Sequence, residues 1–139
     1  MSQLHQTAAT LRFFSEALDP DEVTALLGRP PTQACRKGDA RARHGGGTWR
    51  ERRGSWTRTV ERLTPGDLDA QIEELLGDLT QDMAVWKALS ERYQADVFCG
   101  LFMREGNEGV LIAPSTLLAL GIRGLRLDLD IYGPELTTL

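Results

Sequence analysis

The fold is decided by residues 64–93, which read T-P-G-D-L-D-A-Q-I-E-E-L-L-G-D-L-T-Q-D-M-A-V-W-K-A-L-S-E-R-Y. Thr64 is a suitable helix cap, and Pro65 fits the first helical turn. Apolar residues then recur almost always at steps of three or four: Leu68, Ile72, Leu75, Leu76, Leu79, Met83, Trp86, Leu89 and Tyr93. This spacing predicts one amphipathic helix of about 27 residues with a bend at Gly77.

Strand patterns lie before and after this helix. Residues 7–14 predict a strand with Leu11 and Phe13 on one face. Residues 96–103 are apolar on both faces, which is typical of a central strand or of a strand that exposes aromatic rings. Residues 125–132 alternate strictly, which predicts a strand with one buried and one wet face.

Shorter segments carry weaker signals. Residues 33–36 predict a short strand, and residues 48–60 predict one or two strands that turn near Arg53–Gly54. The Gly45–Gly47 run indicates a flexible surface loop. Val110–Ile112 is interpreted as the returning strand of a hairpin that begins at residue 96.

Two short helices complete the element order. Asp19, Pro20 and Glu22 form a start signal for a helix over residues 20–27, and residues 114–120 predict another. Together the elements predict an α+β two-layer sandwich, with three helices on one face of a mixed, mainly antiparallel sheet. The last two-thirds of the chain suggests a partly ferredoxin-like unit. We expect one domain over residues 1–139, with residues 1–6 as a flexible tail.

The composition indicates a globular protein. The 139 residues include 41% hydrophobic and 26% charged side chains, so the chain is neither disordered nor a disulfide scaffold. No apolar run approaches the length of a membrane span, and no secretory signal is visible. These two observations favour a cytoplasmic location. Cys35 and Cys99 lack metal-ligand or redox spacing, and in a reducing compartment we expect them to be free thiols.

Charge is distributed unevenly along the chain. Residues 36–62 hold nine basic and three acidic residues, which gives this segment a net charge of +6. The rest of the chain has a net charge of −10, and the whole chain has a net charge of −4. This asymmetry bears on partners rather than on the fold. An anionic partner and neutralisation within the molecule both account for it.

Four stretches in order resemble a known bacterial family. They are L-R-F-F-S-E-A-L-D-P-D-E-V-T-A-L-L-G, P-T-Q-A-C-R-K-G-D, R-R-G-S-W-T-R-T-V-E and V-L-I-A-P-S-T-L-L-A-L-G-I-R-G-L-R-L-D-L-D-I-Y. The set, over residues 7–133, resembles the domain of unknown function 4279. The sequence departs from that pattern at Cys35, where an aromatic residue is expected, and at Ala113, where serine would cap a helix better. The resemblance implies a fold and a cytoplasmic location, and it transfers no catalytic residue.

Three groups of residues are candidates for binding. Asp128 and Asp130 share one strand face and suit a cation or a small ligand, or else simply form a solvated face. Arg36 and Lys37 suit a phosphate or carboxylate, or else lie in a charged surface turn. The third group consists of Trp49, Arg52, Arg53 and Trp56. It suits binding of nucleic acid or protein, or else forms an edge hairpin with its tryptophans in the core.

No pattern in the sequence indicates catalysis, a metal centre or a cofactor. His5 and His44 have no spaced nucleophile, and the residues around Lys37 lack phosphate-loop spacing. We therefore expect a non-enzymatic, accessory or immunity-like module that binds another protein, present as a monomer or weak homodimer. Nucleic-acid binding through residues 36–62 is one alternative, although the acidic total charge disfavours it. A small-ligand or metal-dependent site near Asp128 and Asp130 is the other.

Overall fold

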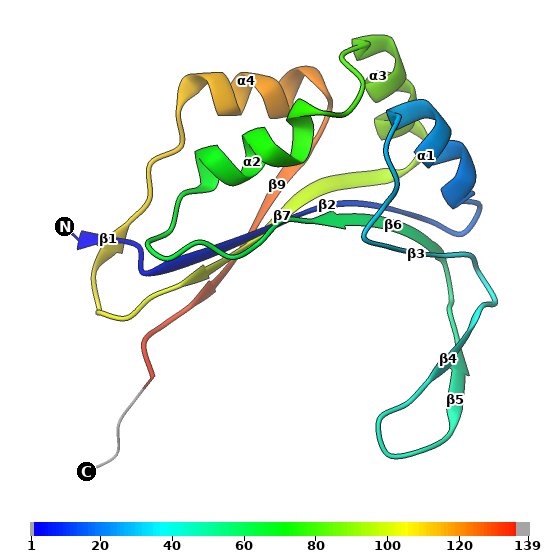
Figure 1. Cartoon of the computed structure of the whole chain (residues 1–139), viewed down its shortest axis with the longest axis horizontal. Coiled ribbons are helices and arrows are strands. Elements are labelled where there is room, and N and C mark those ends of the chain that lie inside the picture. Colours follow the sequence, from blue (N-terminus) through cyan, green and yellow to red (C-terminus); the bar gives the residue numbers. More distant parts are fainter. Residues whose placement is uncertain (1, 136–139) are drawn as a thin grey trace.

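The computed structural model describes residues 2–135 and is organised around a five-stranded sheet of order β3-β6-β2-β7-β9 (Figure 1). The strands are β1 (Ser2–Gln3), β2 (Gln6–Ser15), β3 (Gln33–Cys35), β4 (Ala40–Ala42), β5 (Thr48–Arg50), β6 (Gly54–Thr59), β7 (Gln94–Phe102), β8 (Glu108–Gly109) and β9 (Arg126–Tyr132). The helices are α1 (Pro20–Leu27), α2 (Leu68–Gly77), α3 (Met83–Arg92) and α4 (Pro114–Ile122). The predicted α+β class is confirmed.

The helices in the described residues cover one face of this sheet (Figure 1). Strand β2 shows why, because its side chains alternate between buried and partly exposed along its length. Leu11 and Phe13 point toward the helices and are fully buried, with Trp56 of β6 and Trp86 of α3 packed around Phe13. The core therefore lies between the sheet and the helices.

The sheet is mixed because β7 and β9 run parallel while the other neighbouring strands run antiparallel. The chain passes from β7 to β9 through α4, as a parallel connection requires. A split ferredoxin-like unit places another strand between two parallel strands, whereas β7 and β9 are direct neighbours. The ferredoxin-like part of the prediction is therefore not confirmed.

The predicted long helix is wrong, because α2 ends at Gly77 and α3 begins at Met83. Asp82 caps α3 by accepting a hydrogen bond from the Ala84 amide at 3.0 Å. A side chain of α3 also holds the connecting segment, since the Trp86 indole donates to the Thr80 carbonyl at 2.8 Å. Apolar spacing continues across the break, so periodicity alone does not reveal it.

The predicted hairpin at Arg53–Gly54 is also wrong. Strand β5 pairs with β4, and the turn between them contains the Gly45–Gly47 run, in which each glycine has a positive φ. Gly54 instead begins β6, which pairs with β2 and β3. The glycine run is thus the turn of a two-stranded hairpin, because glycine adopts positive φ at little cost.

The N-terminal residues and the segment after β7 also differ from expectation. Residues 108–109 pair in parallel with β1, so residues 110–112 are not the returning strand of a hairpin with β7. Leu4 is only 3% exposed. The described residues 2–6 are therefore part of the fold rather than a flexible tail.

Candidate functional site

The face of the sheet opposite the helices carries the candidate site. We call it the helix-free face and define it by alternate residues of four strands. These are Gln6, Ala8, Thr10, Arg12 and Phe14 of β2, Ser55, Thr57 and Thr59 of β6, Asp96, Phe98, Gly100 and Phe102 of β7, and Arg126, Asp128, Asp130 and Tyr132 of β9. The surface mixes arginines, carboxylates and aromatic rings, in contrast to the apolar face beneath the helices.

An ion pair occupies the centre of the helix-free face. Strand register places Arg12 opposite Asp96, and two parallel hydrogen bonds of 2.7 and 2.9 Å join them. Asp96 is fully buried, while the Arg12 side chain retains 23% exposure. The guanidinium lies 4.4 Å from the ring centre of Phe98 and 5.1 Å from that of Phe14. Bidentate pairing and the two rings hold this cation in one orientation.

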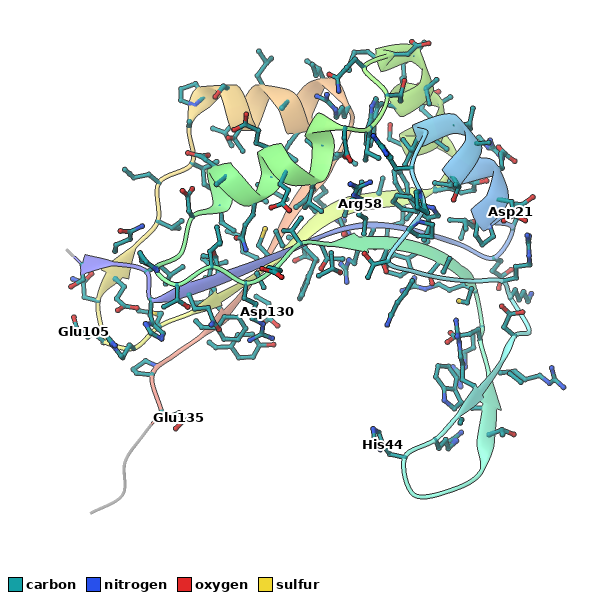
Figure 2. The ribbon with its side chains drawn as sticks, viewed as in Figure 1. Asp21, His44, Arg58, Glu105, Asp130 and Glu135 are labelled. Carbon is teal, nitrogen blue, oxygen red and sulfur yellow. The ribbon has the colours of Figure 1, made fainter. Side chains whose placement is uncertain are left out.

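The predicted carboxylates lie beside this centre on β9. Asp128 approaches Arg12 Nη2 at 3.5 Å, so it adds to the network instead of standing free. Asp130, labelled in Figure 2, accepts a 2.6 Å hydrogen bond from the Tyr132 hydroxyl, and this raises the pKa of Tyr132. Both carboxylates are therefore engaged by side chains of the same face.

A second aromatic cluster lies where β7 and β9 end, at Phe102 and Tyr132. The rings of Phe102 and Tyr132 stack with centres 4.8 Å apart and planes 4° apart. The Arg62 guanidinium lies 4.6 Å from the centre of the Phe102 ring. Gly100 leaves room for this ring, because a Cβ atom at that position would lie 3.0 Å from it.

The opposite end of the helix-free face is basic. Arg53 lies 4.2 Å from the centre of the Phe14 ring, which ties it to the same surface. From this end the β4–β5 hairpin extends on the side away from the helices (Figure 1), with His44 near its tip (Figure 2). The hairpin carries Trp49 at 39% exposure. Within residues 2–135, Arg43 and Arg52 form no ion pair.

Other basic residues of the 36–62 segment form ion pairs within the molecule. Arg36 lies 2.7 Å from carboxylate oxygens of both Asp19 and Asp21, at the start of α1. This contact lowers the pKa of Asp19. Lys37 lies 3.6 Å from Glu16. Arg36 and Lys37 therefore belong to an exposed charged cluster beside α1 and not to the helix-free face.

Trp56 is a correction to the predicted binding residues. Its side chain is fully buried, packs edge-on against Phe13 at 5.8 Å, and donates to the Thr24 hydroxyl at 3.0 Å. Register explains the difference, because Trp56 pairs with Phe13 and shares its helix-facing side of the sheet. A partner cannot reach this ring in the folded protein.

Sequence reasoning missed the centre of the face. Arg12 and Asp96 are 84 positions apart and meet only through the register of β2 and β7. One signal was present, since residues 96–103 place Phe98 and Phe102 on the face opposite Val97 and Leu101. That pattern is compatible with an exposed aromatic row, but it does not identify the arginines beneath and beside the rings.

A groove of about 450 Å³ lies between α2 and α4, away from the helix-free face. At one end Asp69 of α2 accepts hydrogen bonds from the Ala113 amide at 3.0 Å and the Thr116 hydroxyl at 2.6 Å. At the other end the buried Arg123 donates to the Ala119 carbonyl and to Gln81. Burial lowers the pKa of Arg123. These contacts hold α4 in place against α2.

The described residues contain no group of three or more histidine, cysteine, aspartate or glutamate side chains placed to hold a metal ion. Among the helices of residues 2–135, none combines the length and apolar character needed to cross a bilayer.

These features define a class of protein: a two-layer α+β domain with helices on one sheet face and an arginine–aromatic surface on the other. The chain belongs to the family described as domain of unknown function (DUF4279), whose model matches residues 5–134. Comparison with curated proteins and with solved structures finds no match.

Proposed function

We propose that this chain is a non-enzymatic, accessory or immunity-like module that binds another protein through the helix-free face and the β4–β5 hairpin. The observation that carries the proposal is the set of arginines lying against aromatic rings: Arg12 on Phe14 and Phe98, Arg53 on Phe14, and Arg62 on Phe102. Arginine and aromatic residues are enriched where protein interfaces gain most of their affinity. Because these side chains already hold each other in position, binding a partner costs little additional side-chain entropy.

The charge on this surface supports a partner with both signs of charge. Arg52 and Arg53 lie at the hairpin end, whereas Asp128 and Asp130 lie on β9. A complementary partner presents carboxylates to the hairpin end and hydrogen-bond donors or cations to β9. Such complementarity selects the partner and fixes its orientation.

Nucleic acid fits this face less well. Asp128 and Asp130 lie on the helix-free face beside the rings on which bases would stack, and carboxylates repel phosphates. If nucleic acid were the partner, affinity would fall steeply with salt and would decline further on substituting Arg52 or Arg53.

A small ligand or metal ion near Asp128 and Asp130 is a separate alternative. Arg12 and Tyr132 already engage these two carboxylates, which leaves them fewer free lone pairs for a cation. A metal- or metabolite-dependent rise in melting temperature would favour this alternative over protein binding.

The proposal includes a cytoplasmic location. Its support is the pair of cysteines, since Cys35 and Cys99 are both free and both buried. Free thiols suit a reducing compartment.

Site-specific photo-crosslinking in the host cell tests the proposed function. The full chain carries a photoreactive phenylalanine derivative at Thr10, on the helix-free face, or at Trp49, on the hairpin. Ala25, exposed on α1, is the matched control position. We expect a protein adduct of one defined mass from Thr10 and Trp49, absent from Ala25 and lost when Arg53→Glu is added. Nuclease-sensitive adducts, equal adducts from Ala25, or no adduct from any position would contradict it.

A further inference from the structure

The free edge of β9 is a surface separate from the helix-free face. Strand β9 pairs along one side with β7 and lies last in the sheet order, so among residues 2–135 no strand pairs with its other side over Arg126–Tyr132. The strand contains no proline or lysine, and its unbroken register with β7 contains no bulge. Natural sheets prevent pairing of an edge with another chain by proline, lysine, bulges or other charged residues, and of these β9 carries the charges of Arg126, Asp128 and Asp130. The opposite edge strand, β3, spans only three residues.

Apolar side chains line this edge on the helix side. Leu129 and Ile131 pair with the core residues Cys99 and Leu101, so they lie on the core side of the sheet. They are nevertheless 40% and 60% exposed, because β9 is the outermost strand. Pairing with a further strand would bury more of Leu129 and Ile131, and removing this apolar surface from water would lower the free energy.

Helix α4 adds to the same apolar surface. Ala119 lines the groove against α2, and Leu117 lies about 160° around the helix from it, given 100° per residue. Since α2 packs on β2 and α4 packs on β9, Leu117 faces the free edge of the sheet. It is 51% exposed. The edge strand and the neighbouring helix therefore both expose apolar side chains at this end of the sheet.

Charges on the other side of β9 suit a second copy of the same strand. Arg126, Asp128 and Asp130 alternate along the helix-free side, and Arg126 forms no ion pair within residues 2–135. Antiparallel pairing about Asp128 places each Arg126 opposite Asp130 of the second copy. The two Asp128 side chains meet at the symmetry axis, where each has Arg12 of its own chain at 3.5 Å.

We infer that this protein forms a two-fold symmetric dimer in which two β9 strands pair antiparallel about Asp128. A two-fold interface must be self-complementary, and this strand meets that requirement in its apolar row and in the two Arg126–Asp130 pairs, while the Asp128 pair at the axis opposes it. The pairing joins two five-stranded sheets into one continuous sheet. The inference uses the edge and the helix side, so it stands independently of the proposed partner.

Sedimentation equilibrium of the full chain over a wide concentration range tests the dimer. We expect a dimer mass that depends on concentration, and a dissociation constant raised at least about tenfold by Ile131→Lys, which places a charge in the apolar row at the end of the new strand pair, opposite Leu125 of the second copy. Leu26→Lys changes a residue of 37% exposure on α1 and should leave the constant unchanged. A monomer at all concentrations up to about 1 mM, or a dimer insensitive to Ile131→Lys, would overturn the inference.

A charge-reversal cycle tests the register and does not rely on an apolar substitution. Arg126→Asp and Asp130→Arg should each weaken the dimer about tenfold, because each creates two like-charge pairs across the interface. The double variant should restore the wild-type constant to within about threefold. Circular dichroism establishes that all variants are folded. Failure of the double variant to recover, with both single variants weakened, would overturn the assigned register.

Discussion

The two faces of the sheet are built from the same strands but are stabilised differently. On the helix-covered face Leu11 and Phe13 are fully buried, so that face gains its free energy from removing apolar surface from water. On the helix-free face the adjacent Arg12 and Phe14 keep part of their exposure and are ordered by an ion pair and by contacts between cations and rings. The comparison shows that one strand with alternating residues provides a rigid core on one side and a fixed polar surface on the other.

The largest expected effect comes from the covered face. Phe13→Ala should lower the free energy of unfolding by about 3–5 kcal/mol, because it leaves a cavity between Trp56 and Trp86. Phe14→Ala, its neighbour on the other face, should cost about 1 kcal/mol. Urea unfolding followed by circular dichroism measures both. Equal losses would show that the two faces do not differ in this way.

Removing the cation at the centre of the helix-free face should have the next largest effect. Arg12→Ala leaves the Asp96 carboxyl group fully buried without its hydrogen-bonded partner, and should cost about 2–3 kcal/mol. Adding Asp96→Asn should recover part of this loss, since a neutral amide is less costly to bury than an uncompensated carboxylate. The same urea titrations measure the double variant. No recovery would mean that Arg12 acts mainly through its packing on Phe98.

Cys99 gives the covered face a dependence on pH. Burial raises the pKa of its thiol to about 12, and the carboxylates of Asp128 and Asp96 add to the effect. The unfolded thiol ionises near pH 9 while the folded thiol stays protonated, so stability falls as pH rises above 9. Between pH 9 and pH 10 we expect the wild type to lose about 1 kcal/mol more than Cys99→Ala. Thermal or urea unfolding at the two pH values measures this, and parallel pH profiles would contradict it.

The smallest effect on stability belongs to the exposed end of the helix-free face. Arg53→Glu should change the free energy of unfolding by less than about 0.5 kcal/mol, because the side chain is exposed and holds only a ring contact. The same substitution should abolish the crosslink from Thr10. A variant that loses stability and keeps the crosslink would reverse the roles assigned to the two faces.

Elements with local signals were predictable from the sequence, and those set by distant contacts were not. Helix α1 has the predicted bounds of 20–27, because Asp19 and Pro20 mark its start and Gly28 its end within one short stretch. The break between α2 and α3 was not predictable, since its apolar spacing is that of a continuous helix. The pairing of β8 with β1 joins residues more than 100 positions apart, a contact that no local pattern indicates.

The same distinction applies to the candidate site. Asp128 and Asp130 were predicted to share one strand face, and they do, because alternation along a strand is a local property. Arg36 carries the same charge as Arg53, yet it pairs with Asp19 and Asp21, while Arg53 lies on Phe14. Charge counts along a sequence cannot separate these two arginines, because the acidic partners of Arg36 lie in another element.

The junction of α2 and α4 links the stability of one helix to that of the other. Helix α4 has nine residues and no side-chain cap of its own, and Asp69 of α2 supplies the bonds at its start. A helix this short is marginal in isolation, so the first turn of α4 depends on its bonds to Asp69 of α2. Native-state hydrogen exchange should therefore show α4 opening more readily than the central strands of the sheet, as a unit coupled to the first turn of α2.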